Sequence, residues 1–176
     1  MNHLSKFSIP LNGIQDGLNE FNFLVDDSFF DSFDHSLIHK GIVRLKVLIN
    51  RNDEIMHLRF LFSGIIELEC DRCLEIFSMP VESEDHLIVK IKEHSEESDL
   101  EEVIIISKHD HHLALASHIY DYLSVRLPYR KIHPEKDDGS SGCDPEALKR
   151  IENLTRHEEN HHDPRWDALK KIKIKK

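Results

Sequence analysis

Hydrophobic and polar residues alternate with a period of two over residues 41–49 and again over 86–91, which is typical of β-strands that bury one face. The pattern is clearest at 41–49, where Ile42, Arg44 and Lys46 interleave with four aliphatic residues, Val43, Leu45, Val47 and Ile49. A turn-forming Asn50–Asp53 follows, and residues 54–68 then read as one or two returning strands. The pattern predicts an antiparallel hairpin, with Gly64 at a bulge or bend.

Shorter extended segments surround this hairpin. They are expected at residues 6–11, 20–25, 74–81, 86–91 and 103–107. Pro80 predicts a break in the first segment after the hairpin, because proline cannot donate to a strand ladder. Residues 93–102 carry six acidic side chains and no lysine or arginine, which predicts a loop.

The periodicity changes to a helical one after residue 112. Apolar residues at helical spacing predict a helix over 113–127 that ends at Pro128. The loop that follows is rich in proline, glycine and aspartate. Asp144–Pro145 and Asp163–Pro164 each combine an N-cap residue with a proline at the first helical position, so each predicts a helix start.

The order of strands first and helices last predicts an α+β fold. We expect an antiparallel β-sheet or partly open barrel in the N-terminal two-thirds, followed by C-terminal helices. The chain divides into a strand-rich core with its closing helix, residues 1–127, and a C-terminal part, residues 128–176. The second part contains the loop, two short helices and a basic tail, packed on the core or extending from it.

The charge distribution indicates what the protein binds. The 176 residues include 32% charged residues, and the formal net charge is −10. An acidic body favours a basic protein as partner, so contact with RNA needs a local basic patch. The C-terminus supplies such a patch with five lysines, at positions Lys170, Lys171, Lys173, Lys175 and Lys176.

The sequence predicts a soluble cytoplasmic protein. It contains no apolar run of the ~20 residues that span a membrane. The N-terminus has no basic stretch leading into an apolar segment, so no secretion signal is expected. An odd number of cysteines then favours reduced thiols over a disulfide framework.

Three cysteines are the candidate chemistry of the chain. Cys70 and Cys73 form a CxxC pair between two extended segments, and Cys143 lies far downstream in the C-terminal loop. A structural zinc ion needs four Cys or His ligands, and His133 is the best candidate for the fourth. Two alternatives are a thiol redox pair at Cys70 and Cys73, or small residues at a strand end with no chemistry.

Nucleic-acid binding is the second candidate function. Arg72, inside the CxxC, is a candidate phosphate contact or a solvated turn residue. Arg165 and Trp166 precede the lysine tail, where a run of like charges is either a solvated tail or an arm that binds nucleic acid. The chain contains no GxGxxG, P-loop, GxSxG or HExxH motif, and nothing pairs an acid with a base. We therefore predict no enzyme activity and no small-molecule substrate.

These motifs, taken in order, resemble a known family. The sequence has Cys70-Asp-Arg-Cys-Leu74, then Leu127–Pro128 at the end of a helix, Gly142-Cys-Asp-Pro145 and Asp163-Pro-Arg-Trp-Asp-Ala-Leu-Lys170. This order resembles the DUF177 or YceD family, the large ribosomal RNA subunit accumulation proteins, over about residues 15–174.

The resemblance implies a non-catalytic factor for accumulation of large-subunit ribosomal RNA and for ribosome assembly. The expected partners are that RNA, a pre-50S particle or a basic ribosomal protein. Some relatives carry further cysteines in the C-terminal loop that complete a four-thiolate site. This chain has only Cys143 there, so a zinc site would need His133 as its fourth ligand.

Overall fold

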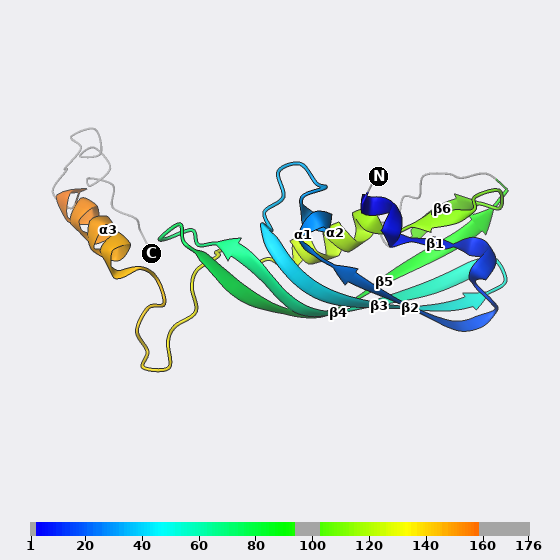
Figure 1. Cartoon of the computed structure of the whole chain (residues 1–176), viewed down its shortest axis with the longest axis horizontal. Coiled ribbons are helices and arrows are strands. Elements are labelled where there is room, and N and C mark those ends of the chain that lie inside the picture. Colours follow the sequence, from blue (N-terminus) through cyan, green and yellow to red (C-terminus); the bar gives the residue numbers. More distant parts are fainter. Residues whose placement is uncertain (1–2, 94–102, 159–176) are drawn as a thin grey trace, which may run out of the picture.

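The computed structural model describes residues 3–93 and 103–158 (Figure 1). The strands are β1 (Ser8–Pro10), β2 (Gly17–Val25), β3 (Lys40–Asn52), β4 (Ile55–Glu69), β5 (Ile76–Lys92), β6 (Val103–Ser107) and β7 (His112–Ala114). The α-helices are α1 (Asp27–Phe30), α2 (Ala116–Val125) and α3 (Pro145–Glu158), and 3₁₀ turns lie at His3–Phe7 and Leu11–Gly13.

The main sheet has five strands in the order β2-β3-β4-β5-β6. Neighbouring strands are antiparallel except β6, which runs parallel to β5. Strands β1 and β7 form a separate antiparallel pair. The predicted α+β fold class is confirmed. The sheet does not close on itself, so of the two expected forms the chain adopts the open sheet and not the barrel.

One face of this sheet forms the core. Alternate residues of β3 and β4 are buried, and α1, α2 and the N-terminal 3₁₀ turn lie over that face (Figure 1). The covering helices insert Phe29, Phe30, Ile119 and Leu123, all of which are buried. Alternation with a period of two therefore separates a buried face from an exposed one, as the sequence pattern predicts.

Strand β4 is one unbroken strand, so the expected bulge at Gly64 is wrong. The register with β3 and β5 is continuous through this residue. A Cβ atom at Gly64 would collide with the carbonyl oxygen of Ile42 on the neighbouring strand. Glycine is needed here because two backbones approach closely.

Strand β5 is also longer than expected, because the predicted break near Pro80 is absent. Both expected segments fall on a single strand, Ile76–Lys92, whose residues 76–90 pair with β4. Strand β6 pairs only with residues 88–92, so β5 is an edge strand at Pro80. The missing N–H of a proline costs no ladder hydrogen bond on an edge strand.

Two other boundaries differ from the prediction. The helix expected from residue 113 begins at Ala116, because His112–Ala114 pairs with β1 instead. The strand expected at 6–11 is shortened to Ser8–Pro10 between two 3₁₀ turns. Most of the acidic loop and the helix expected at residue 163 lie outside the described residues. Among the helices that are described, none is long and apolar enough to span a membrane.

Candidate metal centre

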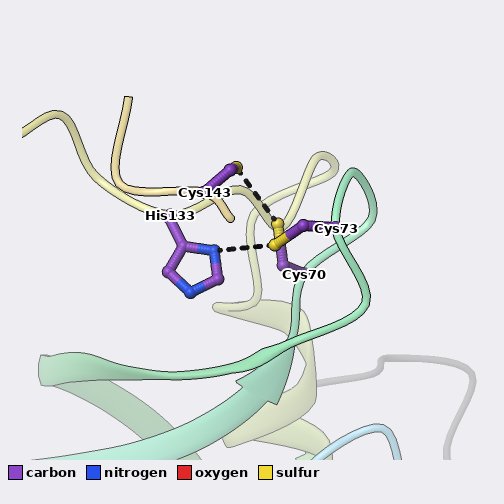
Figure 2. Close-up of side chains that lie close together, drawn as sticks. All are labelled: Cys70, Cys73, His133 and Cys143. Atoms are coloured by element: carbon purple, nitrogen blue, oxygen red, sulfur yellow. Dashed lines mark hydrogen bonds between the residues drawn. The ribbon is translucent and has the colours of Figure 1, made fainter. Parts of the chain in front are cut away.

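The CxxC pair occupies the turn between β4 and β5. Cys70 closes this turn, since its N–H donates to Glu75 O at 3.0 Å and its carbonyl accepts from Leu74 N at 2.9 Å. Leu74 adopts a left-handed backbone, with φ 64°. The tight turn brings the two thiols to one side of the hairpin tip (Figure 2).

The C-terminal loop returns to this tip and is hydrogen-bonded to it. Asp71 N donates to Lys131 O at 2.7 Å, and Lys131 N donates to a carboxylate oxygen of Asp71 at 2.7 Å. The Lys131 ammonium lies 3.5 Å from the other oxygen of the same carboxylate. The sequence did not predict this pairing of Asp71 with Lys131, here called the Asp71–Lys131 clamp, because the two residues are sixty positions apart in the chain.

The C-terminal loop folds back on itself, so that residues 133–135 and residues 141–143 lie side by side as two arms. Glu135 and Ser141 form an antiparallel bridge, and Lys136 N donates to Ser140 O at 2.8 Å. A Cβ at Gly142 would collide with the Pro134 carbonyl and lie 3.0 Å from the Cβ of His133. The close approach that this glycine permits places His133 and Cys143 on adjacent arms.

All four predicted ligands meet at this point (Figure 2). Cys70 Sγ lies 3.7 Å from Cys143 Sγ, and Cys73 Sγ lies 3.5 Å from His133 Nδ1. All four donor atoms lie within 4.8 Å of one another. A tetrahedral zinc ion with bonds of about 2.3 Å to sulfur and about 2.0 Å to nitrogen separates its ligands by about 3.8 Å (S–S) and about 3.5 Å (S–N). The cluster could therefore bind a metal ion such as zinc.

Burial and backbone N–H donors shift the pKa values of the Cys70 and Cys73 thiols. Burial raises the pKa of Cys70, but N–H groups of Cys73, Arg72 and His133, with the His133 side chain, outweigh it and lower that pKa to about 6. Burial is also the main cause of the raised pKa of Cys73, to which the neighbouring thiols Cys70 and Cys143 contribute. Donors directed at sulfur stabilise a thiolate, which is the form that binds metal.

Two of the four candidate ligands are buried and two are partly exposed to solvent. Cys70 is 0% exposed and Cys143 is 2% exposed, while Cys73 and His133 are half-buried. The His133 ring packs on Phe77 with 5.0 Å between ring centroids. All three cysteines are free thiols, and the 3.7 Å between Cys70 and Cys143 is far longer than the ~2.05 Å of a disulfide bond.

Helix α3 starts directly after the last ligand. Asp144 caps it, because its carboxylate oxygens accept from Glu146 N at 3.2 Å and Ala147 N at 2.9 Å. The N-cap and the proline that follows it are the predicted start signal, which the structure confirms. Cys143 therefore links the cluster to the base of α3.

The candidate nucleic-acid residues are only partly described. Arg72 is exposed at the hairpin tip, and its Nη1 donates to Ser141 Oγ at 3.4 Å. Ser141 in turn accepts from Cys143 N at 3.2 Å. Arg165 and the five lysines of the tail lie outside the described residues.

The fold and the cluster together define an open-sheet α+β protein in which a Cys₃His set joins a hairpin tip to a C-terminal loop. The chain belongs to the YceD family, whose model, described as "Large ribosomal RNA subunit accumulation protein YceD", matches residues 58–173. The match confirms the resemblance and begins within β4, later than the expected residue 15. Comparisons with curated proteins and with solved structures gave no match.

Family membership implies a role in accumulation of the RNA of the large ribosomal subunit. The matched residues include the CxxC turn, the C-terminal loop and α3. The four candidate ligands and the helix beyond them thus lie within the residues that the family model matches.

Proposed function

We propose that this protein is a non-catalytic cytoplasmic factor that supports large-subunit RNA accumulation by binding that RNA or a basic ribosomal protein during assembly. The family match carries this proposal. The net charge of −10 supports attraction of a basic ribosomal protein. The lysine-rich C-terminus and Arg72 are the proposed contacts to RNA phosphates.

The second part of the proposal is that Cys70, Cys73, His133 and Cys143 bind one zinc ion. The agreement between the Cys70–Cys143 and Cys73–His133 donor distances and the edges of a zinc tetrahedron is the observation that supports it. The ion would tie the C-terminal loop to the hairpin tip. Residues 1–127 would then form the core unit, to which zinc fastens residues 128–176.

Metal analysis tests the zinc proposal directly. Protein purified without chelator should contain about one zinc per chain, as one four-ligand site requires. Cys70→Ser and Cys143→Ser should each lose the ion, because both thiols belong to the proposed ligand set. Ser140→Ala changes the same loop without removing a ligand and should retain it. A metal-free wild-type protein with unchanged stability would overturn the proposal.

Sedimentation with large-subunit precursors tests the binding proposal. The protein should co-sediment with these particles at low salt and dissociate at high salt. Replacing Lys170, Lys171, Lys173, Lys175 and Lys176 with glutamine should weaken an association that depends on RNA. If the variant is unaffected and nuclease treatment leaves the protein bound to a ribosomal protein, the RNA contact is wrong and the protein contact is supported.

Thiol redox chemistry is the alternative function, and the lowered pKa of Cys70 is the observation in its favour. A redox pair would react with an alkylating reagent in the native protein at neutral pH. The burial of Cys70 and its position at a hairpin tip predict slow alkylation instead. Rapid native-state alkylation of Cys70 would favour the redox function over the assembly function.

A further inference from the structure

Strand β2 leaves one edge of the main sheet without a partner strand. Within residues 3–93 and 103–158, β2 pairs only with β3 and forms the margin of the sheet (Figure 1). The backbone N–H and C=O groups on its other side therefore face no described strand. A free edge of this kind is a template for pairing with another strand.

The side chains of β2 are also incompletely covered on both faces of the sheet. On the core face, Phe21 and Phe23 are only half-buried, whereas their register partners on β3 are buried. On the outer face, Leu18 is 74% exposed and Leu24 is 55% exposed. A strand added beside β2 would therefore cover apolar surface as well as backbone groups.

The opposite margin of the sheet is protected against such pairing. Among the described strands, β6 pairs only with residues 88–92 of β5, so the rest of that margin is also an edge. It contains Pro80 and the exposed Glu82 and Glu84, and proline and charged side chains are the usual protection of an edge strand. Strand β2 has no proline or lysine, its nine residues pair with β3 without a bulge, and Glu20 is its only charged residue.

The single charge on the β2 edge is neutralised within the chain. Glu20 Oε1 lies 3.0 Å from Lys46 Nζ and accepts from Asn22 Nδ2 at 3.2 Å. The edge is therefore neutral and apolar, although the whole chain has a net charge of −10. Such an edge does not select a strongly basic partner, and it allows two acidic chains to approach each other.

The sequence of β2 is complementary to itself in one antiparallel register. Registers that keep the two core faces on the same side of a joined sheet place the two-fold axis on a residue. With the axis on Phe21, all nine residues overlap, Leu18 lies opposite Leu24 of the second copy, and Glu20 lies opposite Asn22. An axis on Glu20 would instead set two like charges opposite each other, and an axis on Asn22 would set Glu20 opposite Leu24.

We propose that two copies of this chain pair antiparallel along β2, with Phe21 on the two-fold axis, and join their main sheets into one continuous sheet. The pairing would add roughly eight to ten backbone hydrogen bonds. It would also form two Leu18–Leu24 contacts on the outer face and cover Phe21 and Phe23 on the core face. A two-fold contact of this kind is the commonest form of association between identical chains. This inference goes beyond the proposed function and depends on neither zinc nor RNA.

Sedimentation equilibrium of the full-length protein, with reductant present, tests the proposal. The wild type should show a reversible equilibrium between monomer and dimer. Leu18→Lys combined with Leu24→Lys should raise the Kd of the dimer at least about tenfold, because like charges would lie opposite each other at two places. Leu18→Lys combined with Leu24→Glu should dimerise more tightly than that variant, since opposite charges would then face each other. Both side chains are exposed in the single copy, so these substitutions leave the core intact.

Ile42→Lys is the matched control. Ile42 is 66% exposed on β3, beyond the residues that pair with β2, so the substitution should leave the Kd unchanged. Hydrogen exchange of the wild type tests the edge without any substitution, because amides on the free side of β2 should exchange more slowly at high protein concentration than at low concentration.

A wild-type protein that stays monomeric at every concentration would overturn the proposal. A dimer with the same Kd in the wild type and the Leu18→Lys, Leu24→Lys variant would also overturn it, because the contact would then lie elsewhere. A monomer that binds a large-subunit ribosomal protein, and loses it in that variant, would overturn it as well and assign the β2 edge to that partner.

Discussion

The sheet layer and the C-terminal loop are held in place by different forces. Helices α1 and α2 attach to the sheet through fully buried apolar side chains. Residues 128–142 contain no buried residue, and Tyr129 is completely exposed. The loop is fixed instead by the Asp71–Lys131 hydrogen bonds and by the convergence of four metal-type ligands.

The proposed zinc ion at the hairpin tip would compensate for this difference. Burial of apolar surface contributes about 25 cal/mol per Å², and in the loop only the partly buried Ile132 packs against the hydrophobic core. A metal ion can replace a core in such a segment, because its binding free energy contributes directly to folding. The two regions should therefore respond to different perturbations.

Removal of the proposed zinc ion is expected to have the largest effect, confined to the loop. Structural zinc in small domains contributes roughly 10 kcal/mol of apparent binding free energy at neutral pH. A strong chelator should abolish hydrogen-exchange protection across residues 128–144 while the amides of β3 and β4 keep theirs. Loss of protection throughout the sheet would show that the two regions are not separately stabilised.

Phe60→Ala tests the apolar layer. The Phe60 side chain is fully buried on β4 and contacts the rings of Phe62 and Tyr122. Its truncation should lower the free energy of unfolding by about 3–5 kcal/mol, measured by urea denaturation. Ile42→Ala on the exposed face is the control and should change it by less than about 0.5 kcal/mol. Zinc content per folded chain should be the same in both variants.

The sequence predicted the cluster better than it predicted the strand lengths. Two thiols three residues apart and a cysteine in a polar loop limit the possible ligands, so all four were identified from residue type and position. Whether β4 and β5 run without a break depends on which strands lie beside them in the sheet. The sequence around Gly64 and Pro80 does not indicate those neighbours. Asp71 was missed for the same reason, because its partner Lys131 is close only in the folded chain.

Gly142→Ala should weaken the loop by an intermediate amount. An added Cβ collides with the Pro134 carbonyl and crowds His133, so the two arms must separate. Overpacking of this kind costs roughly 1–3 kcal/mol, which corresponds to about a tenfold loss of zinc affinity in a chelator competition. Gly13→Ala is the control, since its Cβ would lie 3.7 Å from a Pro10 side-chain atom, an ordinary contact. Equal affinities would contradict the close approach of the arms.

Asp71→Ala should have a smaller effect on the same loop. It removes the acceptor of the Lys131 N–H but leaves the Asp71 N–H bond to Lys131 O in place. One hydrogen bond of this type contributes about 1 kcal/mol, so exchange of the Lys131 amide should accelerate about fivefold. Glu75→Ala at the same turn should not change that rate, and a similar acceleration there would argue against a specific clamp.

Acidification should produce the smallest change, and it acts on the apolar layer through His118 of α2. Burial lowers the pKa of His118, although the nearby Asp121 opposes the shift. Because the folded-state pKa lies below the unfolded value of about 6.5, the unfolded state binds more protons as the pH falls. The stability contribution of the neutral ring is thus complete above about pH 6.5 and is lost as the pH drops through the folded-state pKa. Urea midpoints at pH 7.5 and pH 5.5 should differ less in His118→Gln than in wild type, and equal differences in the two proteins would contradict this role of His118.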